Sequence, residues 1–378
     1  MKSVKVSFVI PCLNEEKAIG KVVSSINYLV SRNKKYKSEI IVVDNGSTDR
    51  SREVAKKAGA KVIFEPKKGY GRALRTGLER ASGEYLIFAD GDGSYDFSET
   101  PKLLSKLQEK DLVIGSRLKG KIKKEAMPFL HRYIGTPVLN FLFSLFFKQK
   151  ISDVNSGFRG LTKKAFEKLK LKATGMEFAS EMIYKASKMN LRIAEVPITY
   201  RRRIGKSKLT PFRDAWRHVK FLLLFSPSFL FLIPGILLIV IGFFLLFWLL
   251  PGKQYLFGKY FDTHTMITAA FLVLTGFQIV FLGLFAKVFA LNFLEGGQDL
   301  TTQKLVRKFS LEQGILAGLI SFFLGLGGFL YVVYLWWQTQ FSVLDAERLL
   351  IFSLTFLVLG LQIIFSSFFF GIIGKEER

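Results

Sequence analysis

The sequence is poor in cysteine and in acidic residues. Its one cysteine, Cys12, excludes a disulfide within the chain and agrees with a reducing compartment. The 30 Asp and Glu residues stand against 55 Lys and Arg, so the formal net charge is +25. The N-terminal stretch MKSVKVSFVIPCLNEE also lacks the long apolar core of a cleavable signal peptide, and we expect none.

Two phosphate-binding signatures are missing as well. No P-loop is present, which excludes the triphosphate grip of P-loop enzymes. No G-x-G-x-x-G follows the first predicted strand, which excludes a dinucleotide site of that type. The first polar loop, PCLNEE, is acidic where a sugar nucleotidyltransferase would need a glycine-rich, basic loop.

Apolar residues are abundant but unevenly distributed. Up to about Lys220 the sequence mixes charges with short apolar runs, and this part fits one large domain. Beyond Phe221 it is almost wholly apolar. A membrane-spanning helix needs about 20 mostly apolar residues. The stretches that meet this length are Ser228–Leu250, Met266–Phe289, Gly314–Trp337 and Leu349–Ile373.

Basic residues in the short loops predict how these spans are oriented. Before the first span stands the basic run RRRIGKSK, and further basic residues follow the second and fourth spans. The opposite side carries only Lys253, Lys259 and Arg348. We therefore expect both termini and the soluble domain on the cytoplasmic side. The expected domains are a soluble cytoplasmic domain at 1–210, a juxtamembrane amphipathic helix at 211–224 and a four-helix transmembrane domain at 225–378.

The soluble part alternates predicted strands with helical patterns. Apolar runs read as buried strands at residues 4–11, 39–44, 60–64, 84–90 and 111–116. Between the runs, apolar residues recur at helical spacing. This alternation predicts an open, mostly parallel α/β sheet, in which ligands bind beyond the carboxyl ends of the strands.

Polar loops follow these predicted strands. Asp44 begins DNGSTD, and its carboxylate can accept a hydrogen bond from the N–H edge of a nucleobase. Lys68, beside two glycines in KKGYGRA, suits a diphosphate. Asp90 and Asp92 in FADGDGSYDF can share oxygen ligation of Mg²⁺ or Mn²⁺, which would bridge to phosphate oxygens. Each loop alone is a common turn sequence, but together they describe one site.

A family resemblance joins these loops. The segments VSFVIPCLNEE, IIVVDNGSTD, KKGYGRAL, FADGDGSYDF, VIGSR and VNSGFRGLTKKAF occur in this order over about 210 residues. The sequence resembles the inverting, family-two glycosyltransferases of the GT-A fold, which is Rossmann-like. More narrowly it resembles the polyprenyl-phosphate sugar synthases, the dolichyl-phosphate mannose or glucose synthase branch. The tail EVPITYRRRIGKSKL strengthens that narrower interpretation.

The resemblance implies roles for individual residues. Asp90 and Asp92 would bind metal and nucleotide-sugar, and both count as catalytic. The expected donor-binding residues are Pro11, Leu13, Asn14, Glu15, Asp44, Lys68, Asp90 and Gly91. The middle residue of the acidic motif is often Ala in the family. We expect Gly91 to affect backbone freedom more than chemistry.

The expected acceptor is a lipid monophosphate. Its second pKa is about 6, so it is largely dianionic at neutral pH and needs no general base. It needs cationic and N–H groups that hold it beside the donor. The candidates are Arg117, Ser156, Arg159, Arg201, Arg203, Ser207 and Lys208. The resemblance points to Arg117, Ser156 and one arginine of 201–203, with Arg117 and Arg203 counted as catalytic.

Other features allow two interpretations each. The basic run RRRIGKSK either holds the acceptor phosphate or is a patch attracted to anionic headgroups, and the two roles are compatible. Glu177 and Glu181 lie one helical turn apart and either contact the sugar or acceptor or form surface salt bridges. Residues 127–147 either form amphipathic helices in the membrane interface or a buried hairpin. The small-residue motif GILAG at 314–318 indicates only helix contact. The four spans are expected to anchor the protein, to help seat a prenyl chain or to form a homo-oligomer.

The leading hypothesis is a membrane hexosyltransferase that acts on UDP-glucose or GDP-mannose and on polyprenyl or dolichyl phosphate. Mg²⁺ or Mn²⁺ would be its cofactor, membrane lipid its surroundings, and nucleic acid is not an expected partner. A processive polysaccharide synthase is one alternative, but it carries a Q-x-x-R-W signature that is missing here. A membrane protein that binds nucleotide-sugar without turnover is the other.

Overall fold

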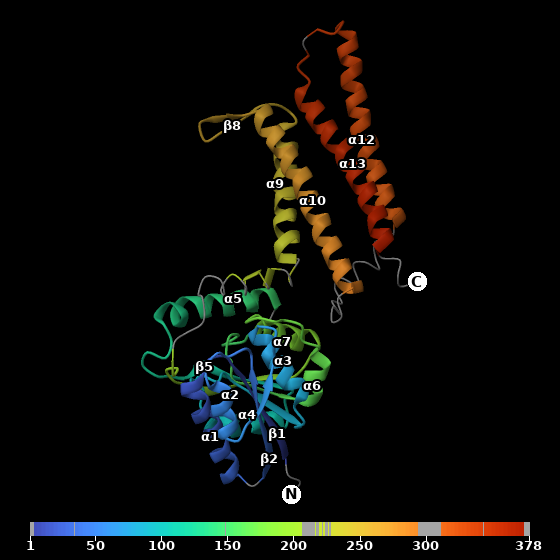
Figure 1. Ribbon diagram of the computed structural model, residues 1–378. Helices are drawn as coiled ribbons and strands as arrows, with labels where there is room; N and C mark the ends of the chain where they lie inside the picture. The colour runs from blue at the N-terminus through green and yellow to red at the C-terminus, as the bar shows by residue number, and fades with distance from the viewer. Residues whose placement is uncertain are drawn as a thin grey trace. The chain divides into compact units, whose positions relative to one another are not determined.

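The computed structural model describes residues 4–33, 35–147, 149–205, 216, 219–220, 222–223, 226, 228–293, 311–342 and 344–373. The chain forms two compact units, and each has its own core (Figure 1). Unit 1 is Met1–Leu222 and unit 2 is Leu223–Arg378.

Unit 1 is built on a seven-stranded sheet of order β3-β2-β1-β4-β6-β5-β7. Its strands are β1 Val4–Cys12, β2 Tyr36–Asp44, β3 Lys61–Phe64, β4 Tyr85–Phe88, β5 Leu112–Ile122, β6 Arg159–Thr162 and β7 Ile193–Tyr200. β6 runs antiparallel to both of its neighbours, and the other pairings in this sheet are parallel. The predicted mostly parallel α/β sheet is confirmed.

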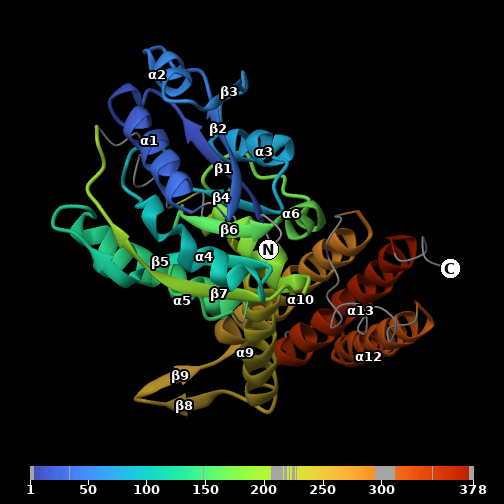
Figure 2. The same cartoon turned by 90° about the horizontal axis from the view of Figure 1, so that it is seen from below.

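Helices cover both faces of this sheet (Figure 2). The helices of unit 1 are α1 Glu16–Arg32, α2 Ser51–Lys57, α3 Tyr70–Arg80, α4 Thr100–Leu107, α5 Thr136–Phe147, α6 Lys163–Leu169 and α7 Phe178–Lys188, with short turns η1 Phe97–Glu99 and η2 His131–Gly135. Alternation along β1 explains the two layers. Phe8 and Ile10 pack with α1, α2 and α4, whereas Val9 packs with α3, α6 and α7.

Helix α5 has two unlike sides. Leu139 and Phe143 are buried in the core that also contains α7. Val138, Phe141 and Leu145 are exposed, and Phe141 keeps 66% of its surface accessible. A helix that is apolar on its exposed side as well as its buried side needs a further apolar environment. The placement of residues 127–147 in a membrane interface stays a prediction.

Unit 2 is helical. Its elements are η3 Ser228–Leu232, α9 Ile233–Leu249, β8 Gln254–Leu256, β9 Lys259–Phe261, α10 Thr263–Phe293, α12 Leu311–Gln338 and α13 Glu347–Ile373. Within the described residues, four helices are long and apolar enough to cross a membrane, and they coincide with the four predicted spans. In the α12–α13 pair, Gly325 and Gly360 each touch the backbone of the facing helix. Small residues at these positions let the two backbones approach closely.

Candidate active site

The candidate site begins where β1 and β2 end. The loops after these two neighbouring strands are bonded to each other. The backbone N–H of Asn45 donates to the carbonyl of Cys12 at 2.9 Å, and the N–H of Glu15 donates to Ser51 Oγ at 2.8 Å. Asn14, in the left-handed region at φ 51°, accepts from the N–H of Thr48 through its side chain. Pro11, Leu13, Asn14 and Glu15 therefore lie on one structural unit with the DNGSTD loop.

Asp44 is fully buried at the end of β2. Its carboxylate accepts from Arg52 Nε at 2.6 Å and from the backbone N–H groups of Gly46 and Ser47. Arg52 is partly exposed and also lies over the ring of Phe64. The Asp44 carboxylate is therefore preorganised to accept a hydrogen bond. An incoming N–H group would take the place of Arg52 on this carboxylate.

The next loop is positioned by Asn45, a residue that sequence reasoning did not single out. Its side-chain oxygen accepts from the N–H of Gly69 at 2.7 Å, and its amide nitrogen donates to the carbonyls of Glu65 and Lys67. Gly69 has φ 150°, and a Cβ there would overlap the carbonyl of Thr174. Lys68 is consequently carried on a fixed backbone with its side chain exposed to solvent.

Asp90 follows β4 and is held by a second residue that sequence reasoning missed. Tyr70, the first residue of α3, donates its hydroxyl to Asp90 Oδ1 at 2.7 Å. Burial and the neighbouring charge of Asp92 raise the pKa of Asp90, and the Tyr70 bond and nearby arginines only partly offset them. Burial raises the pKa of Tyr70 as well, so its hydroxyl remains a donor at neutral pH. This site therefore favours any added cation.

Gly91 lies between the two acids, and the reason for a small residue is close packing. A Cβ at this position would lie 3.1 Å from both Ile10 and the carbonyl oxygen of Pro11. Its φ is not in the left-handed region, so no special backbone freedom is used. The expectation that Gly91 matters for backbone freedom is wrong for this structure.

Asp92 is buried, with the negative charge of Asp90 and the positive charge of Arg203 near it. Its Oδ1 accepts from the N–H of Ser94 at 3.0 Å, and its Oδ2 lies 3.3 Å from Arg203 Nη2. The hydroxyl oxygen of Ser94 is buried and has no hydrogen-bond partner among the residues that the structure describes. Magnesium and manganese prefer oxygen ligands and take one or two carboxylates plus substrate phosphates. Two carboxylates one residue apart, with a buried hydroxyl two residues further along the chain, fit such an ion, and Asp90 and Asp92 would hold it.

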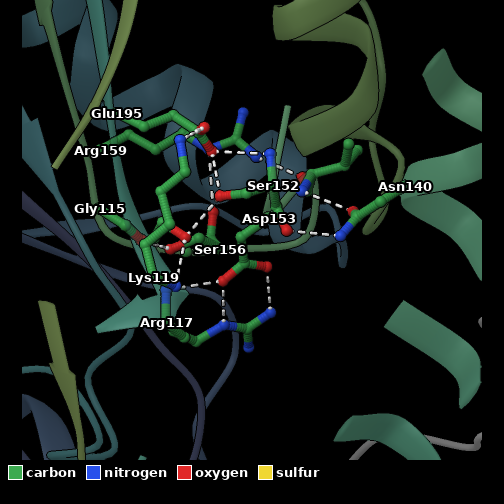
Figure 3. Close-up of polar contacts among 12 residues, drawn as sticks. Gly115, Arg117, Lys119, Asn140, Ser152, Asp153, Ser156, Arg159 and Glu195 are labelled. Atoms are coloured by element: carbon green, nitrogen blue, oxygen red, sulfur yellow. Dashed lines mark hydrogen bonds and ion pairs between the residues drawn. The ribbon is translucent and has the colours of Figure 1, made fainter. Parts of the chain in front are cut away.

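Arg117, near the middle of β5, forms a buried ion pair with Asp153 (Figure 3). Its Nε and Nη2 donate to the two carboxylate oxygens at 2.8 and 2.7 Å. Burial alone would lower the pKa of Arg117, but Tyr95 and Asp153 more than offset this, and the pKa is raised. The guanidinium lies 5.1 Å from the ring centre of Tyr200 and is among the charges that act on Asp90.

Ser156 and Arg159 occupy interior positions near Arg117 (Figure 3). Ser156 Oγ donates to the carbonyl of Gly115 at 2.5 Å. Arg159 is fully buried, and its guanidinium donates to the carbonyls of Val154, Ser156 and Ala179. Burial lowers the pKa of Arg159 to about 10. Because these bonds hold the 154–159 loop, the structure gives Arg159 a supporting position and not an open one.

The three consecutive arginines after β7 face three different acids. Arg201 pairs with Asp96, Arg202 with Glu125 and Arg203 with Asp92. Burial lowers the pKa of Arg203, but Asp92, Tyr200 and Asp90 outweigh it and the net pKa is raised. Only Arg203 of this trio reaches the acidic pair, so the structure does not bring Arg201 to the site. Ser207 and Lys208 lie outside the described residues.

Glu177 and Glu181 hold the chain between α6 and α7. Glu181 is buried, accepts from the N–H groups of Lys172 and Ala173, and pairs with Lys185 at 2.8 Å. Glu177 accepts from the N–H of Gly175. The two carboxylates therefore accept hydrogen bonds from the backbone of the loop at residues 172–175 and hold it in place. The salt bridge of Glu181 exists, but it is buried and not on the surface.

Comparison with known proteins gives two family matches. Residues 7–170 match the model described as glycosyl transferase family 2, which covers the four polar loops of the site. Residues 294–374 match the glycosyltransferase family 2 C-terminal transmembrane region. The chain is thus an integral membrane protein with a transmembrane region, and the predicted GT-A fold class is confirmed.

Individual proteins are similar to this chain over different lengths. The low-salt glycan biosynthesis hexosyltransferase of Haloferax volcanii is 38% identical over 373 residues, which is 98% of this chain and 89% of that protein. The dolichyl-phosphate hexose transferase of the same organism is 33% identical over 53% of this chain and 84% of its own length. A crystal structure of glucosyl-3-phosphoglycerate synthase from Mycobacterium tuberculosis with Mn²⁺ and UDP aligns with a TM-score of 0.46 and 23% identity, over 58% of this chain and 79% of that chain.

Proposed function

This chain belongs to glycosyltransferase family 2, and we propose that it moves a hexose from a nucleotide-diphosphate sugar to polyprenyl phosphate with inversion. The supporting observation is the meeting of opposite charges at one edge of the sheet. Arg203 contacts the acidic pair through Asp92, and Tyr200 joins Arg203 to Arg117. An acidic corner beside two arginines suits a reaction between two anionic partners.

The donor would occupy the loops that follow β1, β2 and β4. Asp44 would accept from the base, Lys68 would approach the diphosphate, and the Asn45-bonded backbone would keep Lys68 in reach. When bound by Asp90 and Asp92, Mg²⁺ or Mn²⁺ would neutralise charge on the leaving diphosphate. Tyr70 would keep one oxygen of Asp90 fixed while the other faces the donor.

The acceptor phosphate would lie on the side of Arg117 and Arg203. An oxygen of the dianionic phosphate would bond to the anomeric carbon as the bond from that carbon to the diphosphate breaks. No proton has to leave the nucleophile, so no general base is needed. Arg117 is fixed by Asp153 and would supply a constant positive charge, since a bidentate pair has little freedom to rotate.

The membrane features support a lipid acceptor. The exposed side of α5 carries Val138, Phe141 and Leu145, and the preceding residues include the exposed Phe129 and Leu130. Together with the basic stretch at 119–124, such a surface suits an anionic membrane interface. We place unit 1 and both termini on the cytoplasmic side, from the basic short loops.

The direct test is transfer by the purified protein in detergent. It would be incubated with labelled UDP- and GDP-hexoses, with polyprenyl phosphate, and with Mn²⁺ or EDTA. We expect one hexose per lipid, dependence on the metal, and no product on polyprenol, the matched acceptor without phosphate. Equal transfer to polyprenol would contradict the proposal. Long glycan products would favour a processive synthase, and donor binding without any product would favour a non-catalytic binding protein.

A further inference from the structure

The arginine trio after β7 is a natural comparison within the chain. The three side chains carry the same charge, stand at consecutive positions, and each has an acid partner. Arg201 and Arg202 are more than half exposed and pair with Asp96 and Glu125. Arg203 retains 28% of its side-chain surface and approaches Asp92, which retains 8%. Only Arg203 therefore supplies its charge to a carboxylate that is buried and assigned to a metal.

We propose that Arg203 stands in for the divalent cation at Asp92 while the metal is absent, and that metal binding releases it toward the acceptor phosphate. This inference rests on the proposed function. It deepens that function because it assigns an order: donor and metal bind first, and Arg203 becomes available to the acceptor phosphate, beside the Asp153-bound Arg117, only afterwards.

The local backbone is held in place, so the Arg203 side chain can move while segment 200–204 stays fixed. The N–H of Ile204 donates to the carbonyl of Asp92, and the N–H of Arg201 donates to the carbonyl of Ser94, both at 2.8 Å. Tyr200 and Tyr95 also form an antiparallel bridge. Segment 200–204 is thus fixed along 92–95 on both sides of Arg203. An exchange at Asp92 then requires only a side-chain rotation of Arg203.

Electrostatics gives the exchange its direction. Asp90 and Asp92 are neighbouring carboxylates, and leaving both without a cation in a buried corner is costly. Arg203 supplies one positive charge at 3.3 Å from Asp92. A divalent ion supplies two charges and competes for the same oxygens. Arg117 cannot take this role, because both carboxylate oxygens of Asp153 hold its guanidinium.

The test measures Mn²⁺ binding by the full-length protein in detergent, without nucleotide or lipid. The electron paramagnetic resonance signal of free Mn²⁺ reports the bound fraction directly. Arg203→Gln removes the competitor and is expected to bind Mn²⁺ about fivefold more tightly than wild type, equivalent to ~1 kcal/mol. Arg202→Gln is the matched control, since it removes the same charge one position away, and its affinity should stay within about twofold of wild type. Arg203→Lys keeps the charge and should resemble wild type.

A second measurement follows the released side chain. With Mn²⁺ and UDP bound, wild type in phosphatidylcholine vesicles should bind polyprenyl phosphate more tightly than polyprenol. The Arg203→Gln variant should lose this preference for the phosphorylated lipid. Thermal unfolding of each variant checks that it is folded.

Three outcomes would overturn the inference. If Arg203→Gln binds Mn²⁺ no more tightly than wild type, Arg203 does not compete with the metal. If Arg202→Gln tightens binding as much as Arg203→Gln, the effect is one of net charge. If Mn²⁺ binds none of the proteins, Asp92 has no metal role. Hexose transfer by wild type, measured separately, shows whether the proposed function stands when this inference fails.

Discussion

The two units differ in which polar groups they bury and in where these groups find their hydrogen-bond and ion-pair partners. Unit 1 buries charges, among them Asp44, Asp92 and Arg159, and gives them partners from other elements. In unit 2 the described buried polar residues are hydroxyls. Ser353 and Thr355 donate to carbonyls one turn back in their own helix, and Ser321 donates to the carbonyl of Phe356 on the facing helix. A charge can be buried where distant loops supply its counter-charge, whereas a helix in a bilayer satisfies its backbone groups within itself and its hydroxyls within the same helix or on a facing one. Chemistry therefore belongs to unit 1, and helix packing to unit 2.

The largest expected effect tests whether the acidic corner carries the chemistry. Asp92→Asn should lower hexose transfer by at least ~100-fold, because a neutral amide is a poor metal ligand and the leaving diphosphate loses its counter-charge. The measurement is the initial rate with saturating donor and polyprenyl phosphate. Asp96→Asn is the control, since this acid of the same loop accepts from Ser98 and pairs with Arg201. Full activity of Asp92→Asn would remove unit 1's acidic corner from the mechanism.

The next effect tests whether the buried charges of unit 1 depend on their partners. Arg117→Ala leaves Asp153 buried and unpaired, so the free energy of unfolding should fall by ~3–5 kcal/mol. The double variant Arg117→Ala with Asp153→Ala removes both charges and should recover part of this loss. Denaturant unfolding of the three proteins measures it. A double variant as unstable as the single one would show that the ion pair is not the cause.

A matched pair of glycines, Gly325 and Gly327, tests whether close helix packing stabilises unit 2. Gly325→Leu would force a side chain into the backbone of α13 at Ser353 and Leu357, whereas a Cβ at Gly327 meets no atom within 4 Å. We expect Gly325→Leu to lower the stability of the helix pair by ~1–3 kcal/mol, and Gly327→Leu to have little effect. Thermal unfolding in detergent gives the comparison. Donor binding should be unchanged in both, and equal destabilisation would contradict close packing at Gly325.

The smallest expected effect tests whether solvent reaches the interior of unit 1 at the end of β1. Burial raises the pKa of Cys12 to about 12, so the thiol is protonated at pH 8 and the reactive thiolate is scarce. Native protein should react with a thiol-specific reagent only slowly at that pH and rapidly after unfolding in detergent and urea. Mass spectrometry follows the modification. Rapid labelling of the folded protein would show that solvent reaches the end of β1.

Much of the fold was predictable because its signals are local. Apolar runs such as 39–44 and 84–90 are short, continuous and followed by polar loops, which indicates buried parallel strands. The spans follow from length and hydropathy alone, since the bilayer sets one thickness for all of them. Asp44, Asp90 and Asp92 could be named as site candidates because strand ends in such a sheet share one edge.

The partners of these residues were decided by tertiary structure. The sequence shows three equal arginines at 201–203, and only the pairing of segment 200–204 along 92–95 determines that Arg203 faces Asp92. Tyr70 positions Asp90, and Asn45 positions the KKG loop. In the sequence both look like ordinary helix and turn residues. The physical reason is that composition and periodicity report burial and local geometry, whereas ion pairs and side-chain hydrogen bonds depend on which distant side chains the folded sheet brings within bonding distance of one another.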